Sequence, residues 1–119
     1  MKTWALLLFV ALLSSGQAID TRDRDFWNGK FNDPKTRFNR EPSRWLAEAI
    51  RGRHAGRALD LGMGEGRNTI YLAQQGWQAT GVDLSDIAVG QAKARAAQLH
   101  VNIAAISDRS TPEIGRAHV

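Results

Sequence analysis

The stretch Ala58-Leu59-Asp60-Leu61-Gly62-Met63-Gly64-Glu65-Gly66 decides the fold. Its first four residues form a short run, apolar except at Asp60, that fits a buried strand, and the run ends abruptly in three glycines at alternate positions. Glycine lets a backbone turn sharply and approach a ligand closely. A helix expected from about Arg67 directs its unpaired N–H groups into the same space. This stretch therefore predicts a strand–loop–helix unit with a ligand site at the turn.

Helical and strand patterns alternate after this loop. The expected elements are a helix that closes at Gly76, a strand over 79–82 ending at Asp83, a helix over about 86–99 capped by Ser85, and a third strand over 101–106. Such alternation indicates βαβ units. We therefore predict an α/β fold with a Rossmann-like parallel sheet, of which three strands and their helices are present.

The residues before the loop are harder to assign. Residues 19–41 are polar and dotted with aromatic residues, with a turn expected at Asp33-Pro34. Pro42 is expected in the first turn of a short helix. The apolar face of that helix would comprise Trp45, Leu46, Ala49 and Ile50. Tyr71 and Trp77, farther along the chain, are expected to be packing residues.

The spacing of the loop distinguishes between ligands. A dinucleotide fingerprint needs G-x-G-x-x-G, and Arg67 occupies the third glycine position. Asp60, two residues before Gly62, would oppose a pyrophosphate but suits an ammonium group. Asp83 lies 17 residues beyond Gly66, near the roughly 20-residue offset of an acid that binds ribose hydroxyls. An amine at one end and a ribose at the other describe S-adenosylmethionine.

Two motifs resemble those of a known family. Residues 58–68 resemble the first motif of class I S-adenosylmethionine-dependent methyltransferases, and Gly81-Val82-Asp83-Leu84-Ser85 resembles the second. The run 41–97 is most similar to small bacterial methyltransferases of the tellurite-resistance type, many of which carry Cys where Met63 stands. The resemblance covers about residues 26–108.

The resemblance implies S-adenosylmethionine as cofactor and a small-molecule methyl acceptor as partner; no metal is expected from the composition. It implies that Asp60 holds the methionyl ammonium, directly or through water, and that Asp83 binds the ribose hydroxyls. The remaining implied cofactor-binding residues are Gly62, Gly64 and Gly66 for the close backbone passage, Leu84 beside the adenine, and Asp108 at the adenine amino group. No catalytic residue is named by either motif.

Two other interpretations remain open. The domain could be a dinucleotide-dependent oxidoreductase, which NAD binding would reveal. Alternatively, the chain could be an inactive fragment, because the family sheet has seven strands and only three are expected here. The first strand would then lie at an open edge of the sheet and favour aggregation.

Both ends of the chain are predicted to lie outside the domain, which would span 42–112. Residues 1–18 are typical of a signal peptide, with Lys2, ten apolar residues and a small-residue cleavage site. Ten residues make roughly 15 Å of helix, too short for a stable membrane span. Export conflicts with the cytosolic supply of the cofactor, so a cytoplasmic location is the alternative. Residues 113–119 match a translated sequencing adapter, so we expect the natural protein to continue differently past Pro112.

Composition excludes several kinds of site. The 119 residues contain no Cys and three scattered His, which leaves no Cys-ligated metal site and no His spacing typical of one. Much of the net charge of +4 lies in the segment from 20 to 44, which mixes seven basic and five acidic residues. Mixed signs are typical of a solvated surface rather than a nucleic-acid interface, although aromatic residues are interleaved there. Phe26, Trp27 and Phe38 are candidates for a lid over the cofactor, the alternative being that they simply pack on the domain.

Overall fold

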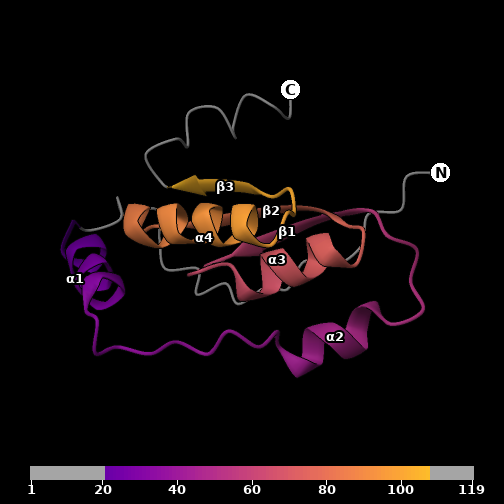
Figure 1. Ribbon diagram of the computed structural model, residues 1–119, viewed down its shortest axis with the longest axis horizontal. Coiled ribbons are helices and arrows are strands. Elements are labelled where there is room, and N and C mark those ends of the chain that lie inside the picture. Colours follow the sequence, from indigo (N-terminus) through magenta and orange to yellow (C-terminus); the bar gives the residue numbers. More distant parts are fainter. Residues whose placement is uncertain (1–20, 108–119) are drawn as a thin grey trace, which may run out of the picture.

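The computed structural model describes residues 21–107, which form a three-stranded parallel sheet with helices packed against it (Figure 1). This arrangement confirms the predicted α/β fold. The elements are α1 (Thr21–Asn32), α2 (Arg44–Ile50), β1 (Arg57–Leu61), α3 (Arg67–Gln74), β2 (Gln78–Asp83), α4 (Asp86–Gln98) and β3 (Ala104–Ser107). The predicted leader, the predicted adapter-derived tail and Asp108 lie outside the described residues.

The strand order is β1-β2-β3, so β1 is an edge strand within residues 21–107, as predicted. All pairs are parallel, with Asp60 opposite Gly81 and Asp83 opposite Ser107. The carboxyl ends of the three strands therefore meet at one edge of the sheet. Figure 1 places α1 at this edge, toward which the β3 arrow points.

The two faces of the sheet differ in their side chains. Ala58, Ala79 and Ala105 face the helices, and small side chains there allow α3 and α4 to approach closely. The alternate positions point the other way, and Leu59 and Leu61 are 42% and 53% exposed. Within the described residues, the sheet is thus covered by helices on one face only.

Apolar residues form two clusters under the helices. One joins α2 and α3 to β2 and comprises Leu46, Ile50, Leu72, Trp77 and Ala79, with Tyr71 packed against it. The other joins the loop after β1 to α4 and β3 and comprises Met63, Val89, Ala92 and Ala105. The prediction that Tyr71 and Trp77 serve packing is confirmed.

Helix ends follow the local signals that predicted them. Ser85 caps α4, since its Oγ accepts a hydrogen bond from Ala88 N at 3.0 Å. Gly76 has a left-handed φ of 88° after α3, and Trp77 N donates to Leu72 O at 2.9 Å across the turn. Both ends are therefore closed by hydrogen bonds.

Three expectations need correction. Pro42 precedes α2 rather than entering its first turn, because Ser43 takes the N-cap position. Trp45 is 79% exposed, because the seven-residue helix turns only Leu46 and Ile50 fully into the core. The third strand begins at Ala104 rather than at 101, since His100 adopts a left-handed φ of 55° and the chain turns there first.

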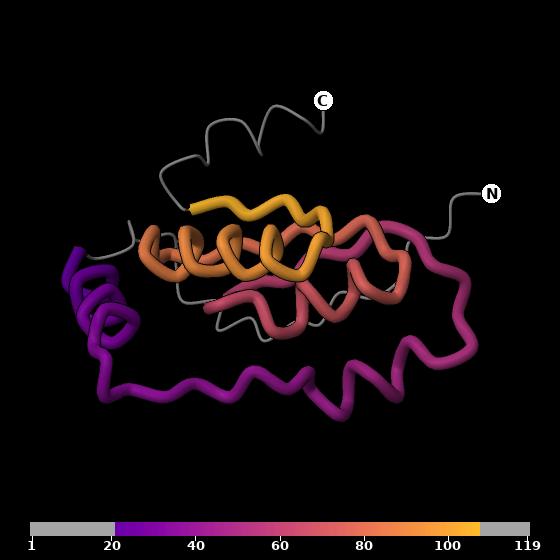
Figure 2. The backbone as a smooth tube through the Cα atoms, viewed as in Figure 1, coloured from indigo at the N-terminus to yellow at the C-terminus, as the bar shows by residue number. Residues whose placement is uncertain are grey.

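Helix α1 was not predicted, because its sequence lacks an apolar period and none of its residues is buried. Hydrogen bonds from its side chains and backbone to residues near the start of α4 hold it in place. Figure 2 shows the segment after α1 running along one side of the domain to α2. The expected turn at Asp33 is present, with Thr36 N donating to Asp33 O at 3.1 Å. No helix within residues 21–107 is long and apolar enough to cross a membrane.

Gly90→Ala is expected to stabilise the domain. Gly90 lies in the interior of α4, exposed, and a Cβ there would meet no atom within 4 Å. Alanine should add about 0.5–1 kcal/mol to the free energy of unfolding, because glycine loses more backbone entropy in a helix. Urea unfolding of the two proteins would measure the gain, and a lower midpoint for the variant would contradict this view of α4.

Candidate functional site

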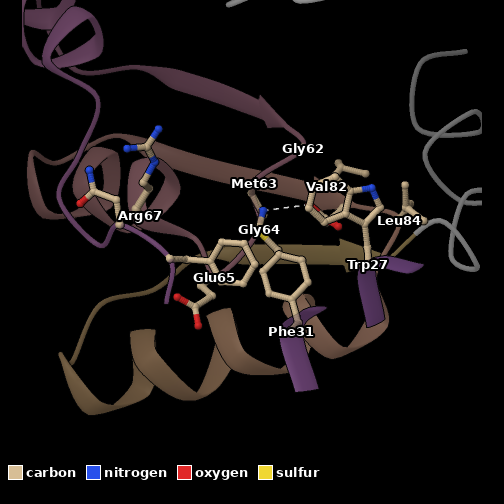
Figure 3. Close-up of a pocket in the computed structure, with 12 residues that line it drawn as sticks. Trp27, Phe31, Gly62, Met63, Gly64, Glu65, Arg67, Val82 and Leu84 are labelled. Atoms are coloured by element: carbon tan, nitrogen blue, oxygen red, sulfur yellow. Dashed lines mark hydrogen bonds between the residues drawn. The ribbon is translucent and has the colours of Figure 1, made fainter. Parts of the chain in front are cut away.

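A cavity of about 920 Å³ opens at the carboxyl ends of β1 and β2 (Figure 3). Three parts of the chain line it: α1 with the segment that follows it, the glycine loop after β1, and the end of β2 with Leu84. Ligand sites in open α/β sheets lie at this edge, outside the carboxyl ends of the strands. The position therefore agrees with the ligand site that the loop predicted.

The glycine loop is fastened to the end of β2. Gly62 N and Met63 N both donate to Val82 O, at 2.8 and 3.0 Å. Gly62 and Gly64 have φ values of 74° and 58°, in the left-handed region that favours glycine. Side chains at these positions would strain the turn, so the two glycines let the bare backbone line the cavity.

Asp83 links the loop to the next helix and also faces the cavity. Its Oδ2 accepts from Gly64 N at 2.8 Å, and its Oδ1 accepts from Ser85 N at 2.9 Å. The residue is half-buried and lines the cavity. A carboxylate has about four lone-pair sites, so Asp83 keeps capacity to accept from two further donors.

Asp60 lies behind the loop rather than in the cavity wall. Its Oδ2 accepts from the Thr69 hydroxyl at 2.7 Å, which turns the carboxyl toward α3. Burial raises the pKa of Asp60 above its usual value, and the negative charge of Asp83 adds to the rise. The hydrogen bonds from Thr69 and the charge of Arg67 partly offset it.

Not all of the predicted site residues meet at the cavity. Gly62, Gly64, Asp83 and Leu84 line it. Gly66 is instead buried at the start of α3, where an added Cβ would lie 3.0 Å from Ala92 Cβ. Glycine at that position therefore permits α3 to pack against α4.

An aromatic wall from α1 and the following segment faces the loop. It comprises Trp27, Phe31 and Phe38, and Figure 3 shows Trp27 and Phe31 beside the glycines. Phe31 and Phe38 stack with centroids 4.5 Å apart, and the Phe31 ring lies 3.5 Å from where a Gly64 Cβ would stand. Phe26, an expected lid residue, packs edge-on against Trp27 and is 57% exposed. The i, i+4 spacing of Trp27 and Phe31 was the signal for this wall.

Polar residues of both signs complete the cavity. The Glu65 side chain is 18% exposed and lines the cavity, with Oε2 3.7 Å from Arg40 Nε. Arg67 also lines the cavity and donates from Nη1 to Glu41 O at 3.2 Å. Residues 21–107 contain no group of three or more His, Cys, Asp or Glu side chains that could hold a metal ion.

The family model of the methyltransferase domain matches residues 58–112, which include the loop, Asp83 and the three strands. Residues 58–112 belong to the methyltransferase-domain family. The motif resemblance seen in the sequence is thereby confirmed, and the class I arrangement of this domain agrees with the observed parallel sheet. The two segments that carry the motifs are those that Asp83 joins through Gly64.

Relatives of the methyltransferase domain agree with this assignment. A curated protein of Geobacillus sp. (strain WCH70), named as a methyltransferase candidate, is 47% identical over 49 residues, which are 40% of this chain. The chain spans about a fifth of the length of that relative. The structure of a methyltransferase from Thiobacillus denitrificans, in complex with S-adenosylhomocysteine, matches with a TM-score of 0.53 and 32% identity, covering 71% of this chain and 36% of that one. TehB from Haemophilus influenzae shares the fold, with a TM-score of 0.52 and 23% identity over 71% of this chain and 27% of that one.

Asp60→Asn is expected to stabilise the methyltransferase domain at neutral pH while weakening cofactor binding. A raised pKa in the folded state means that the charged form of Asp60 is disfavoured by folding, and a neutral amide avoids that penalty. The gain in stability of the variant should vanish as the pH falls below 3.8. There Asp60 is protonated in both the folded and the unfolded parent protein, so folding no longer buries a charge. If Asp60 holds the ammonium group, as the resemblance implies, loss of its charge should reduce affinity for S-adenosylhomocysteine about tenfold or more.

Thermal unfolding at several pH values, together with calorimetric titration, measures both effects of Asp60→Asn. A variant less stable than the parent protein at pH 7 would contradict the account of the buried carboxyl. An unchanged affinity would contradict the ammonium contact alone.

Proposed function

We propose that this chain carries the cofactor-binding half of an S-adenosylmethionine-dependent methyltransferase that acts on a small-molecule acceptor. The observation that carries the proposal is the placement of Asp83. Its carboxylate is held by Gly64 N and Ser85 N, faces the cavity, and keeps lone pairs for two more donors. The vicinal hydroxyls of a ribose supply two such donors.

The residues at the cavity fit the cofactor in their chemistry. Asp83 would bind the ribose hydroxyls, and Leu84 offers an apolar surface to the adenine. Gly62 and Gly64 leave the backbone open along the cavity wall. Asp60, behind the loop, would act on the methionyl ammonium through bridging water.

Bound S-adenosylmethionine supplies a methyl group that its sulfonium already activates, so the protein needs chiefly to align the two reactants and exclude water. The glycine loop and Asp83 would fix the orientation of the cofactor. Trp27, Phe31 and Phe38 would cover one side of the cavity and keep water from it. No residue within 21–107 is assigned as a general base.

A dinucleotide fits the same cavity less well. Arg67 stands where the fingerprint needs its third glycine, and the carboxylates of Asp60, Glu65 and Asp83 gather around the loop. These negative charges would repel a pyrophosphate but favour a ligand with an ammonium group. The methyltransferase relatives and their S-adenosylhomocysteine complex support the same choice.

Titration calorimetry of the 119-residue chain with S-adenosylhomocysteine and, separately, with NAD tests the proposal. We expect saturable binding of S-adenosylhomocysteine and none of NAD. Binding of NAD alone would overturn the proposal in favour of an oxidoreductase. Binding of neither ligand would overturn it for this chain and favour an inactive fragment.

A further inference from the structure

Helix α1 forms one wall of the cavity, and several hydrogen bonds attach it to the residues around the start of α4. None of its residues is buried. Arg24 Nε donates to Leu84 O at 3.2 Å, and Gln91 Nε2 donates to Phe31 O at 2.8 Å. These hydrogen bonds, together with the stacking of Phe31 on Phe38, therefore help to fix the position of the aromatic wall.

Asn28 makes the central contact of this set. Its Oδ1 accepts from Ser85 Oγ at 2.6 Å, and its Nδ2 donates to Asp86 Oδ1 at 2.9 Å. Ser85 is fully buried, with no exposed surface. The side-chain amide of Asn28 thus joins α1 to Ser85, the N-cap of α4, and to Asp86, the first residue of that helix.

The contact continues into the cofactor site. Ser85 N donates to Asp83 Oδ1 at 2.9 Å, and Asp83 Oδ2 accepts from Gly64 N at 2.8 Å. Three consecutive hydrogen bonds therefore connect α1 to the glycine loop. They join Asn28 to Ser85, Ser85 to Asp83, and Asp83 to Gly64. Such contacts are strengthened where water is excluded, and Ser85 lies in such a place.

The residue type at position 28 is fixed by its two partners. The Ser85 hydroxyl has one proton and already accepts from Ala88 N, so its proton must go to an acceptor, which Asn28 Oδ1 provides. Asp86 presents a carboxylate oxygen, to which Asn28 Nδ2 donates. A carboxylate at position 28 would keep the first contact and replace the second by repulsion.

We propose that Asn28 is a positioning residue that couples the seating of α1 to the geometry of the Asp83 carboxylate and the glycine loop. This inference rests on the proposed function, because Asp83 is there the ribose-binding group. Trp27 adjoins Asn28 on α1 and lines the cavity. Seating of α1 strengthens cofactor binding, and by thermodynamic linkage the bound cofactor strengthens the seating of α1 equally.

The test uses the 119-residue chain with S-adenosylhomocysteine as the probe. Asn28→Ala should lower the affinity about tenfold and speed amide hydrogen exchange in α1 and at Gly64 and Ser85, even without ligand. In the parent protein the ligand should slow exchange throughout α1, and in the variant this protection should be largely lost. Asn32→Ala, on the same helix, is the matched control and should behave as the parent protein.

A partner exchange separates positioning from a general loss of structure. Asn28→Asp should lose affinity as Asn28→Ala does, because the new carboxylate faces Asp86. Asp86→Asn alone should retain binding, since an amide oxygen still accepts from Asn28 Nδ2. The double variant should recover most of the affinity, because the exchanged pair again has one donor and one acceptor.

The outcomes distinguish this inference from the proposed function. If the parent protein binds S-adenosylhomocysteine and Asn28→Ala binds it equally well, the inference is wrong. If the parent protein does not bind S-adenosylhomocysteine, the proposed function fails. Separately, unchanged hydrogen exchange at Gly64 and Ser85 in Asn28→Ala would overturn the coupling, whether or not the ligand binds. If Asn28→Ala does not fold, the variant that combines Asn28→Asp with Asp86→Asn decides. Recovery of affinity relative to Asn28→Asp supports the inference, and no recovery overturns it.

Discussion

Replacing Asp83 by alanine is expected to reduce affinity for S-adenosylhomocysteine at least a hundredfold. The carboxylate accepts from Gly64 N and Ser85 N, and each of these N–H groups would lose its partner. An unpaired buried donor such as Ser85 N costs about 1–3 kcal/mol, and the acceptor of the ribose hydroxyls disappears as well. The substitution therefore weakens the attachment of the loop, the start of α4 and the contact with the ligand at the same time.

Asp83→Asn separates these effects, because one amide oxygen can still accept while the NH₂ group would oppose a backbone N–H. We expect a loss of affinity smaller than that of Asp83→Ala but still above tenfold, measured by titration calorimetry. Asp25→Asn, an exposed acid on α1, is the matched control and should bind as the parent protein does. Tight binding by Asp83→Ala would show that the ligand does not contact this carboxylate.

Gly81→Ala is expected to give the largest loss of stability. Gly81 is buried on the helix-facing side of β2, opposite Asp60. A Cβ there would overlap Met63 Sδ and lie 2.7 Å from Thr69 Oγ1. Either Met63 must leave its buried place, which moves the loop, or the Thr69 bond to Asp60 must break. Overpacking of this kind costs about 1–3 kcal/mol, and the displaced loop should also lose S-adenosylhomocysteine binding.

Urea unfolding measures the effect of Gly81→Ala, and two further variants show its cause. Met63→Ala combined with Gly81→Ala should be less destabilised than the sum of the single changes, since the overlapping sulfur is gone. Gly90→Ala is the contrasting glycine change and should raise stability. A Gly81→Ala protein as stable as the parent would contradict the packing of Met63 over β2.

Most of the fold from β1 to α4 could be predicted because its signals are local. Three glycines mark the turn after β1, Gly76 ends α3, and Ser85 caps α4 through an atom three residues away. Patterns of this kind act within a few residues, so a single sequence displays them. The third strand was placed too early because apolar composition alone does not reveal the left-handed turn at His100.

The helical form of α1 and the contacts that attach it were beyond such reasoning, although Trp27 and Phe38 were expected near the cofactor. The helix has no apolar period, and its contacts join residues 57 to 60 positions apart. The role of Asn28 depends on its contact with the buried Ser85 hydroxyl, and nothing in the sequence indicates that these two residues are neighbours. The resemblance likewise assigned Asp60 and Asp83 to one cofactor site, but the Thr69 hydroxyl turns Asp60 toward α3 and leaves Asp83 at the cavity.

The most direct test of the account is an amide-resonance titration of the isotope-labelled 119-residue chain with S-adenosylhomocysteine. We predict saturable shifts at Gly62, Gly64, Asp83 and Leu84, with no shift at Gly90 on the exposed side of α4. Absence of shifts at the four cavity residues, or shifts confined to residues away from the cavity, would contradict the assignment of this cavity to the cofactor.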